Sequence, residues 1–500
     1  MINSIKRPAK EFDRNNTVGS QSAKSTRAFA LSVLMSVLLT ACGGWNDVNQ
    51  DSASNNESAA EGASSTAVTA TASAGSIPFS GAVTTDSGSV VTSAVTGEQQ
   101  LQVTGLSCPA KTAPGPIKTR MVSASDPVAV PSNYMGLHRS LHTPAWMPDA
   151  YGEIPAPTYP YGIVRNLRVE VDGQEERGFW ANIEVAPGVY DWSYMDKWAQ
   201  ANAGHPIMWM IYGTPSFYQK YPGEPARWPS WPGIGSPPTD AGHAALKRFA
   251  QAVKSRYGSQ IAAFEVWNEP TLPWTGGVTS FNDRWSPSWG QANGQYHAPF
   301  FSGSASDLAN IAYTLNTANL GVPVLGAAFA DLWSTGATTV ERFLNAPITL
   351  PGGYGVGKDH IQGLSTHFYD YNFNPEGLIQ QTDGYRAKLV NAGVGHLPIW
   401  GSETGAEDGG VFQQYDWRAP INIKRWILIG AAKKLQSMVL YGHFSGTETW
   451  RFLGGPIRNQ DVIATLADGF EIGGKTICDA AVLQDGRVWV TTAEGKDFLI

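Results

Sequence analysis

The stretch that decides the fold reads Ile261-Ala262-Ala263-Phe264-Glu265-Val266-Trp267-Asn268-Glu269-Pro270. Its first seven residues are almost all apolar, as in a strand buried on both faces, and the proline ends it. The preceding stretch, Gly242–Gly258, gathers large apolar residues on one face at the helical period. A helix followed by a buried strand is the repeating unit of parallel α/β folds, and this unit is the best marked in the chain.

The same alternation continues through the chain from about residue 130 onward. Asp307–Leu320 and Ile421–Leu435 are predicted as further helices. Eight runs are predicted as strands: Tyr134–Arg139, Ile163–Val169, Pro206–Tyr212, Ile261–Trp267, Val322–Ala327, Ile361–His367, Leu397–Ser402 and Ser437–His443. They predict an α/β fold, a (β/α)8 TIM barrel with enlarged loops over 107–450. A doubly wound sheet is the alternative, but it requires a glycine-rich turn after the first strand, which Met135–Arg139 lacks. Residues 451–500 are expected to form a small C-terminal β appendage packed on the barrel.

Two predicted strands end in a glutamate. One delivers Asn268 and Glu269 to its end, and the other runs Leu397-Pro398-Ile399-Trp400-Gly401-Ser402-Glu403. Chemistry in such barrels sits at the C-terminal ends of strands. Two carboxyl groups facing each other there are what retaining glycoside hydrolysis requires, because one protonates the leaving oxygen while the other attacks the anomeric carbon.

These segments resemble clan A of the glycoside hydrolases. Trp267-Asn268-Glu269-Pro270 is similar to the clan's acid/base signature, and Trp400–Gly405 is similar to its nucleophile segment. The sequence around Glu269, Phe264–Pro270, is most similar to that of family 39, which contains xylosidases and exopolysaccharide endoglycosidases. The resemblance covers about residues 130–445. It implies that Glu269 is the general acid/base and Glu403 the nucleophile.

The resemblance also implies substrate-binding residues. Asn268 would hydrogen-bond the substrate 2-hydroxyl, and His367-Phe368-Tyr369 matches the clan's His-x-Tyr, in which Tyr369 orients the nucleophile. Arg165 would supply positive charge near Glu403. We therefore expect a lowered pKa for the nucleophile and a raised one for the acid.

Other residues admit two interpretations each. His138 lines the cleft or packs at its rim, and Trp274 is a candidate sugar-stacking platform. The clan's tryptophan at the end of strand eight is missing, so Tyr441 is expected to substitute, or Trp450 to reach in. Glu265 is interpreted as a buried structural ion pair with Arg165 rather than a catalyst.

Cofactor motifs are missing from the sequence. Its nine histidines include no His-Glu-x-x-His pair, which argues against catalytic zinc. Gly352–Lys358 imitates a phosphate-binding loop, but Asp359 stands where a serine or threonine would ligate magnesium. We expect neither a metal nor another cofactor.

The N-terminal region has the pattern of an export signal. A basic stretch precedes the apolar run Ala28–Ala41, which is too short for a membrane span of about 20 residues. Leu39-Thr40-Ala41-Cys42 resembles a bacterial lipobox, which implies that 1–42 is a lipoprotein signal peptide and that Cys42 carries a lipid anchor. An ordinary signal peptide is the alternative. The sequence then predicts export and attachment to the bacterial cell envelope, at the outer membrane or the periplasmic face.

Residues 43–106 are rich in Ser, Ala, Thr and Gly and are expected to be a flexible tether. Cys108 and Cys478 bracket the predicted folded region. Because an exported protein meets oxidising conditions, we expect them to form a disulfide; two unpaired thiols are the alternative.

Composition narrows the class of ligand. The net charge is −7, which argues against nucleic acid as a partner. Charged residues make up only 15% of a chain that has 18 tryptophans. This combination suits a neutral ligand such as a polysaccharide or oligosaccharide, bound by stacking and hydrogen bonds.

The sequence therefore predicts a monomeric, membrane-anchored retaining β-glycosidase that acts on a polysaccharide. The loops Gly213–Thr239 and Thr271–Phe301 are rich in Trp and Pro and favour an open groove with endo cleavage. The alternatives are an exo-acting β-xylosidase-type enzyme, a catalytically silent carbohydrate-binding surface lipoprotein and a structural envelope lipoprotein.

Overall fold

The computed structural model describes residues 107–138, 162–166, 178–222, 235–270, 301–330, 336–370, 376–406, 418–440 and 467–500. The predicted signal peptide and tether, with Cys42, lie outside these ranges, and so do residues 223–234 and 271–300 of the two Trp- and Pro-rich loops. Within the described ranges, no helix combines the length and the apolar character needed to cross a membrane.

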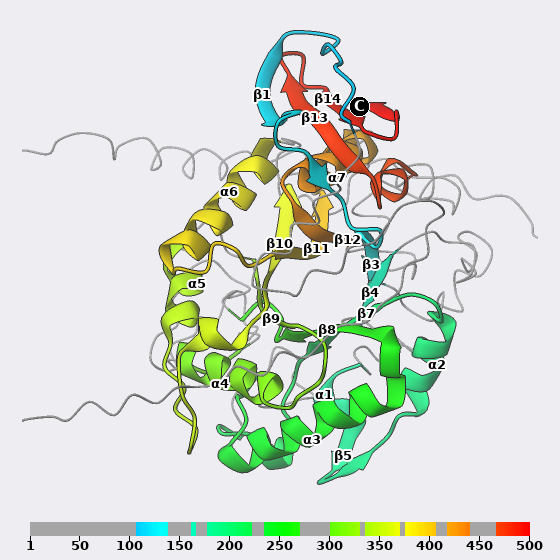
Figure 1. The fold of residues 1–500 in the computed structure, drawn as a ribbon. Coiled ribbons are helices and arrows are strands. Elements are labelled where there is room, and N and C mark those ends of the chain that lie inside the picture. Colours follow the sequence, from blue (N-terminus) through cyan, green and yellow to red (C-terminus); the bar gives the residue numbers. More distant parts are fainter. Residues whose placement is uncertain are drawn as a thin grey trace, which may run out of the picture. The chain divides into compact units, whose positions relative to one another are not determined.

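Eight parallel strands close into a barrel (Figure 1). Around the barrel the order is β10-β11-β12-β3-β4-β7-β8-β9, so each strand pairs with its neighbours in sequence order and the last meets the first. The strands are β3 (Met135–His138), β4 (Ile163–Arg165), β7 (Ile207–Ile211), β8 (Ile261–Val266), β9 (Val324–Phe329), β10 (Gly363–Asp370), β11 (Ile399–Ala406) and β12 (Leu435–Leu440). The predicted (β/α)8 barrel is thus confirmed.

The strand bounds depart from the prediction mainly at the C-terminal ends. β10 and β11 continue to Asp370 and Ala406, because their backbones stay paired through His367↔Glu403 and Phe368↔Thr404. The predicted bounds followed the apolar runs, whereas the ladder continues beneath polar side chains. Glu403 therefore lies within a strand rather than just beyond one.

Helices lie on the outside of the barrel, as Figure 1 shows for α3 to α6. They are α1 (Trp180–Ile183), α2 (Ser193–Ala201), α3 (Asp240–Tyr257), α4 (Ala305–Asn316), α5 (Gly336–Asn345), α6 (Glu376–Asn391) and α7 (Arg418–Ala432). α3, α4 and α7 confirm the three predicted helices within a few residues. Short elements complete the chain: β5 (Glu184–Ala186), β6 (Val189–Tyr190), η2 (Ser216–Tyr218), η3 (Gly258–Gln260) and η4 (Gly357–His360).

Local sequence explains where helix α3 begins and ends. The Thr239 side chain accepts a hydrogen bond from the Gly242 amide at 3.1 Å and so caps its first turn. Gly258 follows its last residue with φ of 55°, a left-handed conformation that glycine adopts without strain. Its apolar face, with Leu246 and Phe249, is fully buried.

The barrel interior is layered along its axis. An apolar cluster fills it below the mouth: Ile163, Met208, Ala263, Leu325 and Val439, with Trp400 packed against them. Gly136 belongs to the same level, because a Cβ there would lie 2.5 Å from Ile163 Cγ2 and 2.9 Å from Val439 Cγ2. Inward-facing residues two positions further along several strands are polar, and they carry the site described below.

A second sheet combines strands from both ends of the described chain. β13 (Thr476–Leu483) pairs with β14 (Val488–Thr492) on one side and with β1 (Ile117–Val122) on the other, while β15 (Asp497–Leu499) follows β14 and β2 (Val128–Ala129) pairs with β13. The predicted appendage, drawn from 451–500 alone, is therefore incomplete. Cys108 and Cys478 are joined by a disulfide, with their Cα atoms 5.4 Å apart.

Candidate active site

The residues singled out in the sequence gather at the C-terminal ends of the barrel strands. Arg165 is the last residue of β4, and Glu269 follows β8. His367 lies near the end of β10, and Glu403 lies in the second half of β11. Four strands thus bring together side chains that are more than 200 residues apart in sequence.

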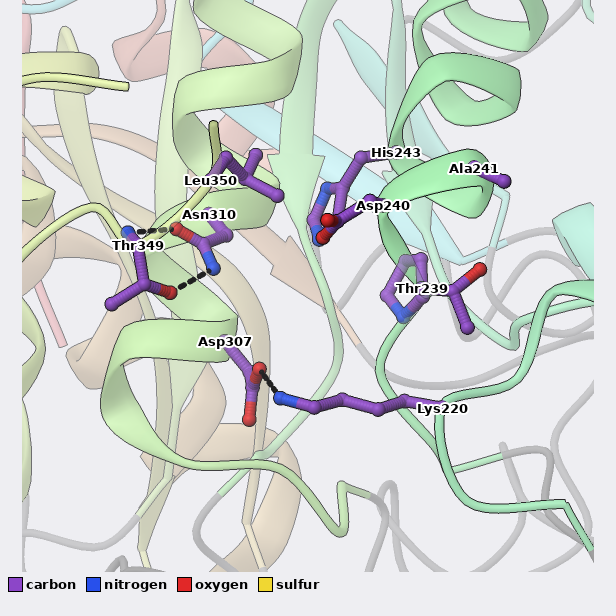
Figure 2. A pocket seen from close by; sticks show the side chains of 10 residues that line it. Lys220, Thr239, Asp240, Ala241, His243, Asp307, Asn310, Thr349 and Leu350 are labelled. Atoms are coloured by element: carbon purple, nitrogen blue, oxygen red, sulfur yellow. Dashed lines mark hydrogen bonds and ion pairs between the residues drawn. The ribbon is translucent and has the colours of Figure 1, made fainter. Parts of the chain in front are cut away.

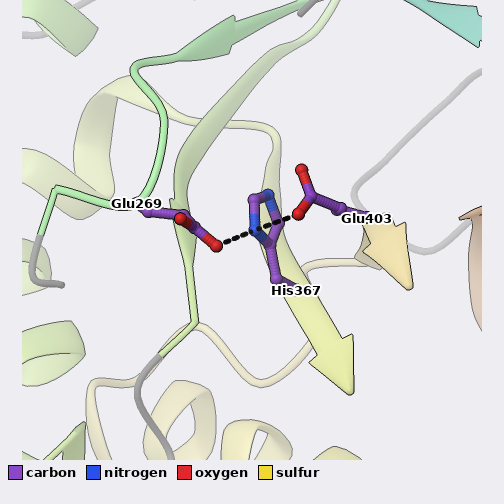
Figure 3. A group of neighbouring side chains, drawn as sticks. All are labelled: Glu269, His367 and Glu403. Atoms are coloured by element: carbon purple, nitrogen blue, oxygen red, sulfur yellow. Dashed lines mark hydrogen bonds and ion pairs between the residues drawn. The ribbon is translucent and has the colours of Figure 1, made fainter. Parts of the chain in front are cut away.

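A histidine lies between the two glutamates (Figure 3). Nδ1 of His367 is 2.7 Å from Oε1 of Glu269 and 3.6 Å from Oε1 of Glu403. One carboxylate oxygen of each glutamate and a ring nitrogen of the histidine all lie within 4.8 Å of one another. The glutamate side chains are only 13% and 7% exposed, so the two carboxyl groups interact at short range in a water-poor environment.

Arg165, at the end of β4, contacts both Glu403 and the residue that precedes Glu269. Its fully buried guanidinium donates from Nη1 to Oε2 of Glu403 at 3.1 Å and from Nη2 to Oδ1 of Asn268 at 2.8 Å. Because Oδ1 of Asn268 accepts from the arginine, the amide NH2 group is the end that remains to donate. The expected placement of positive charge beside Glu403 is confirmed.

Glu403 also accepts a hydrogen bond from the Tyr369 hydroxyl. Burial nevertheless raises the pKa of Glu403, and the charge of Glu269 raises it further, against the lowering effects of His367, Arg165 and Tyr369. The expectation of a lowered nucleophile pKa is therefore wrong in direction. The hydrogen-bond donors lower the pKa of Glu403 by less than the burial of the carboxylate, at the end of an apolar strand, raises it.

The backbone after β8 is left-handed at two non-glycine residues, Trp267 with φ of 60° and Glu269 with φ of 40°. Such conformations are uncommon for large side chains and require support from packing. The Trp267 ring is fully buried, with centroids 5.0 Å from Tyr212 and 4.9 Å from Phe301. The segment keeps its pairing with β9, since the Glu269 amide donates to Ala328 O at 3.1 Å.

Three buried residues form a polar layer directly beneath the glutamate pair. Glu265 accepts from Arg165 Nε at 2.6 Å and from the Ser365 hydroxyl, which also lies 2.7 Å from the Ser402 hydroxyl. The predicted Glu265–Arg165 ion pair is confirmed. Both serines were missed, although each lies in a predicted strand.

Glu269, His367 and Glu403 are also the one group of metal-ligand type in the described part of the chain. Ligands around a tetrahedral zinc ion lie about 3.3 Å apart, given bonds of about 2.0–2.1 Å. The 2.7 Å between His367 and Glu269 is instead a hydrogen-bond distance. The arrangement therefore fits a hydrogen bond between the two side chains better than a bound ion.

Some predicted residues cannot be placed. Trp274 and Tyr441 lie outside the described residues, and His138 is described only as the last backbone position of β3. Trp209 is fully buried and stacks on Tyr257 at 5.4 Å, so it is a core residue.

A cavity of about 510 Å³ opens between α3 and α4 (Figure 2). Glu269, His367 and Glu403 are not among the residues that line it. Its polar groups bind one another: Lys220 pairs with Asp307 at 2.7 Å, and Asn310 bonds Thr349 at 2.8 Å. His243 bonds Thr314 at 2.8 Å. The catalytic candidates are thus at the barrel mouth and not in this cavity.

The chain matches no family model and no curated protein sequence. Solved structures with a similar fold include a GH39 enzyme from Xanthomonas axonopodis pv. citri, at 17% identity over 75% of this chain and 74% of that one, with a TM-score of 0.42. A glucosidase from Croceicoccus marinus is 13% identical over 74% and 77%, with a TM-score of 0.42. Xylanase 10B from Thermotoga maritima is 10% identical over 68% and 97%, with a TM-score of 0.40.

These likenesses are too distant to bear on activity, and the closed parallel barrel already establishes the fold. Fold and site together define a (β/α)8 barrel whose mouth holds a buried pair of glutamates, bridged by a histidine and supported by an arginine.

Proposed function

We propose that this protein is a retaining glycoside hydrolase in which Glu403 is the nucleophile and Glu269 the general acid/base. The observation that carries the proposal is the approach of the two carboxylates to within 4.8 Å. Retaining enzymes hold their carboxyl groups about 5–5.5 Å apart, whereas inverting enzymes leave about 6.5–9.5 Å for a water molecule. The spacing leaves no room for that water between the pair.

The reaction then proceeds in two displacements. The Glu403 carboxylate forms a bond to the anomeric carbon while the glycosidic C–O bond breaks, and Glu269 gives its proton to the departing oxygen. Water next attacks the glycosyl ester and gives a proton to Glu269. The ester C–O bond breaks, which releases the sugar and restores the Glu403 carboxylate.

The hydrogen-bond partners support this division of roles. Glu403 receives charged and neutral donors from Arg165 and Tyr369, which hold a carboxylate in a fixed orientation. Glu269 is hydrogen-bonded to an imidazole nitrogen at 2.7 Å, a group that can hold the carboxyl in position for proton transfer. Asn268, oriented by Arg165, would offer its amide NH2 to a sugar hydroxyl.

The substrate class rests on the sequence. The resemblance to clan A favours β-linkages, and the resemblance to family 39 favours an exopolysaccharide. The Trp- and Pro-rich loops favour endo cleavage of a polymer over exo attack of the β-xylosidase type.

The decisive experiment incubates the purified protein with β-glucans, xylans, mannans and bacterial exopolysaccharides and follows product configuration by proton NMR. We expect the first-formed product to keep the β configuration. Glu269→Gln and Glu403→Gln should be inactive, and Glu184→Gln, an equally buried glutamate outside the site, is the matched control. A first-formed α product, or full activity in either site variant, would overturn the proposal.

A catalytically silent carbohydrate-binding lipoprotein is the alternative of a different class. It predicts polysaccharide binding without turnover, and binding that survives Glu403→Gln unchanged. The ion-paired and hydrogen-bonded setting of Glu403 argues against it, because a lectin has no use for an oriented carboxylate opposite a proton donor.

We also propose that the protein is exported and anchored through Cys42. The Cys108–Cys478 disulfide supports export, since such bonds persist in oxidising compartments. Labelling of growing cells with a radioactive fatty acid tests the anchor. Label should enter the wild type and not Cys42→Ala, and equal labelling of both would contradict it.

A further inference from the structure

Glu265 occupies a place that the reaction itself does not require. It is fully buried on β8, lies below the catalytic pair, and belongs to neither displacement. A buried carboxylate is costly unless it is paired and hydrogen-bonded. Both oxygens of Glu265 are in fact engaged, one by Arg165 and the other by Ser365.

We propose that Glu265 is a positioning residue that acts through Arg165: it holds the guanidinium where that group reaches Glu403 and Asn268 together, and it takes up part of the positive charge. This inference rests on the proposed roles of Glu403 and Asn268.

The guanidinium of Arg165 donates one hydrogen bond to each of three polar side chains. Arg165 uses Nε toward Glu265 at 2.6 Å, Nη1 toward Glu403 at 3.1 Å and Nη2 toward Asn268 at 2.8 Å. A planar guanidinium fixed at Nε has little freedom left in its two outer nitrogens. The bond to Glu265 thus sets the direction of both upper contacts.

The distances from Arg165 to the two carboxylates show how its charge is divided. Arg165 lies closer to Glu265 than to Glu403, so its charge is shared between two carboxylates and weighted toward the lower one. An arginine devoted to Glu403 alone would stabilise the carboxylate more strongly and weaken it as a nucleophile. Glu265 therefore keeps Glu403 oriented without making it inert.

The serines anchor the arrangement to two further strands. Ser365 lies two residues before His367 on β10, and Ser402 directly precedes Glu403 on β11. Their hydroxyls are 2.7 Å apart, and Ser365 donates to Glu265. Glu265 thus lies at the junction of β4, β8, β10 and β11, the four strands that deliver the site.

The test measures the titration of Glu403 directly. In the full protein labelled with 5-¹³C glutamate, the Glu403 carboxyl signal is the one lost in Glu403→Gln. Glu403 is faced by Arg165 from β4, by His367 and Tyr369 from β10, and by Glu269 from the end of β8. All of these remain in Glu265→Gln, whose amide can accept from Arg165 and donate to Ser365.

Removing the charge of Glu265 should move the Glu403 titration midpoint to lower pH by about one unit. The acid limb of kcat/KM should move with it, and kcat should fall more than KM rises. Glu265→Asp keeps the charge but withdraws it from Arg165 by one methylene, so it should shift the midpoint in the same direction by less.

Glu184→Gln is the matched control and should leave the midpoint in place. An unshifted midpoint in a folded Glu265 variant, or a uniform loss of activity at every pH, would show a purely structural role and overturn the inference. Because the NMR titration needs no substrate, inactivity of the wild type toward every glycoside would contradict the proposed function without deciding the role of Glu265.

Discussion

Nδ1 of His367 lies 2.7 Å from Oε1 of Glu269, so the carboxyl group proposed to supply the catalytic proton is hydrogen-bonded to an imidazole nitrogen. The same nitrogen is 3.6 Å from Glu403. A change in the charge of any one of the three groups therefore changes the electrostatic environment of the other two.

The two glutamates should fail in different ways when replaced. Glu269→Ala should lose about 10³-fold in kcat/KM on substrates with poor leaving groups, and much less on aryl glycosides whose leaving group needs no proton. Added azide should restore turnover and yield a β-glycosyl azide, because a small anion can replace the water that Glu269 activates. Mass spectrometry and NMR of the product check this, and rescue of Glu403→Ala to a β product would contradict the assignment.

The acid limb of activity should lie above the range of an ordinary glutamate. A nucleophile must be ionised, and the pKa of Glu403 is raised mainly by burial, so activity falls as the pH drops through that raised value. His367→Gln removes a positive charge that lowers the pKa of Glu403, and its acid limb should therefore move further toward higher pH.

The pH dependence of kcat/KM checks the effect of His367. His360→Gln, which replaces an equally buried histidine away from the site, should leave the profile unchanged. A shift of the His367→Gln limb toward lower pH would contradict this reading of the site.

His243 should make the folded protein acid-sensitive. Burial lowers the pKa of His243 to about 4, with Asp307, Asp240 and Lys220 as its charged neighbours. Below the ordinary value near 6.5 the unfolded chain binds a proton that the folded chain does not. The contribution of His243 to the free energy of unfolding is thus fully present above pH 6.5. It declines as the pH falls toward 4, by up to about 3 kcal/mol.

Urea unfolding at several pH values measures the contribution of His243. His243→Gln keeps a partner for Thr314 and should flatten the decline between the two pKa values. An identical decline in the wild type and the variant would assign the acid sensitivity to other groups.

The disulfide should stabilise the terminal sheet. It links Cys108 to Cys478 across 370 residues, and loss of a bond that closes so long a loop should lower the free energy of unfolding by about 2–5 kcal/mol. The Cys108→Ser/Cys478→Ser double variant tests this by urea unfolding, with amide exchange reporting whether β1 and β13 open first. Unchanged stability relative to Cys42→Ser would contradict the prediction.

Sequence patterns predicted the barrel because each strand is an apolar run bounded by turn residues, and the strands follow one another around the closed sheet. Glu269 and Glu403 were found because each ends such a run. The serines beneath them were not, since Ser365 and Ser402 meet Glu265 only through the register of the closed barrel, which no local pattern encodes. The pairing of β1 with β13 was missed for the same reason, because strand partners distant in sequence carry no shared local signal.

The left-handed backbone at Trp267 and Glu269 makes the site more fragile than the barrel that carries it. Each such residue costs about 1–3 kcal/mol, and the packing of the Trp267 ring between Tyr212 and Phe301 opposes relaxation. Mild denaturant that loosens this packing should release the segment while the strands stay paired. Activity would then disappear before tryptophan-independent signals of unfolding appear. The denaturant concentration that the enzyme tolerates would be set by the packing of one aromatic ring and not by the global stability of the protein.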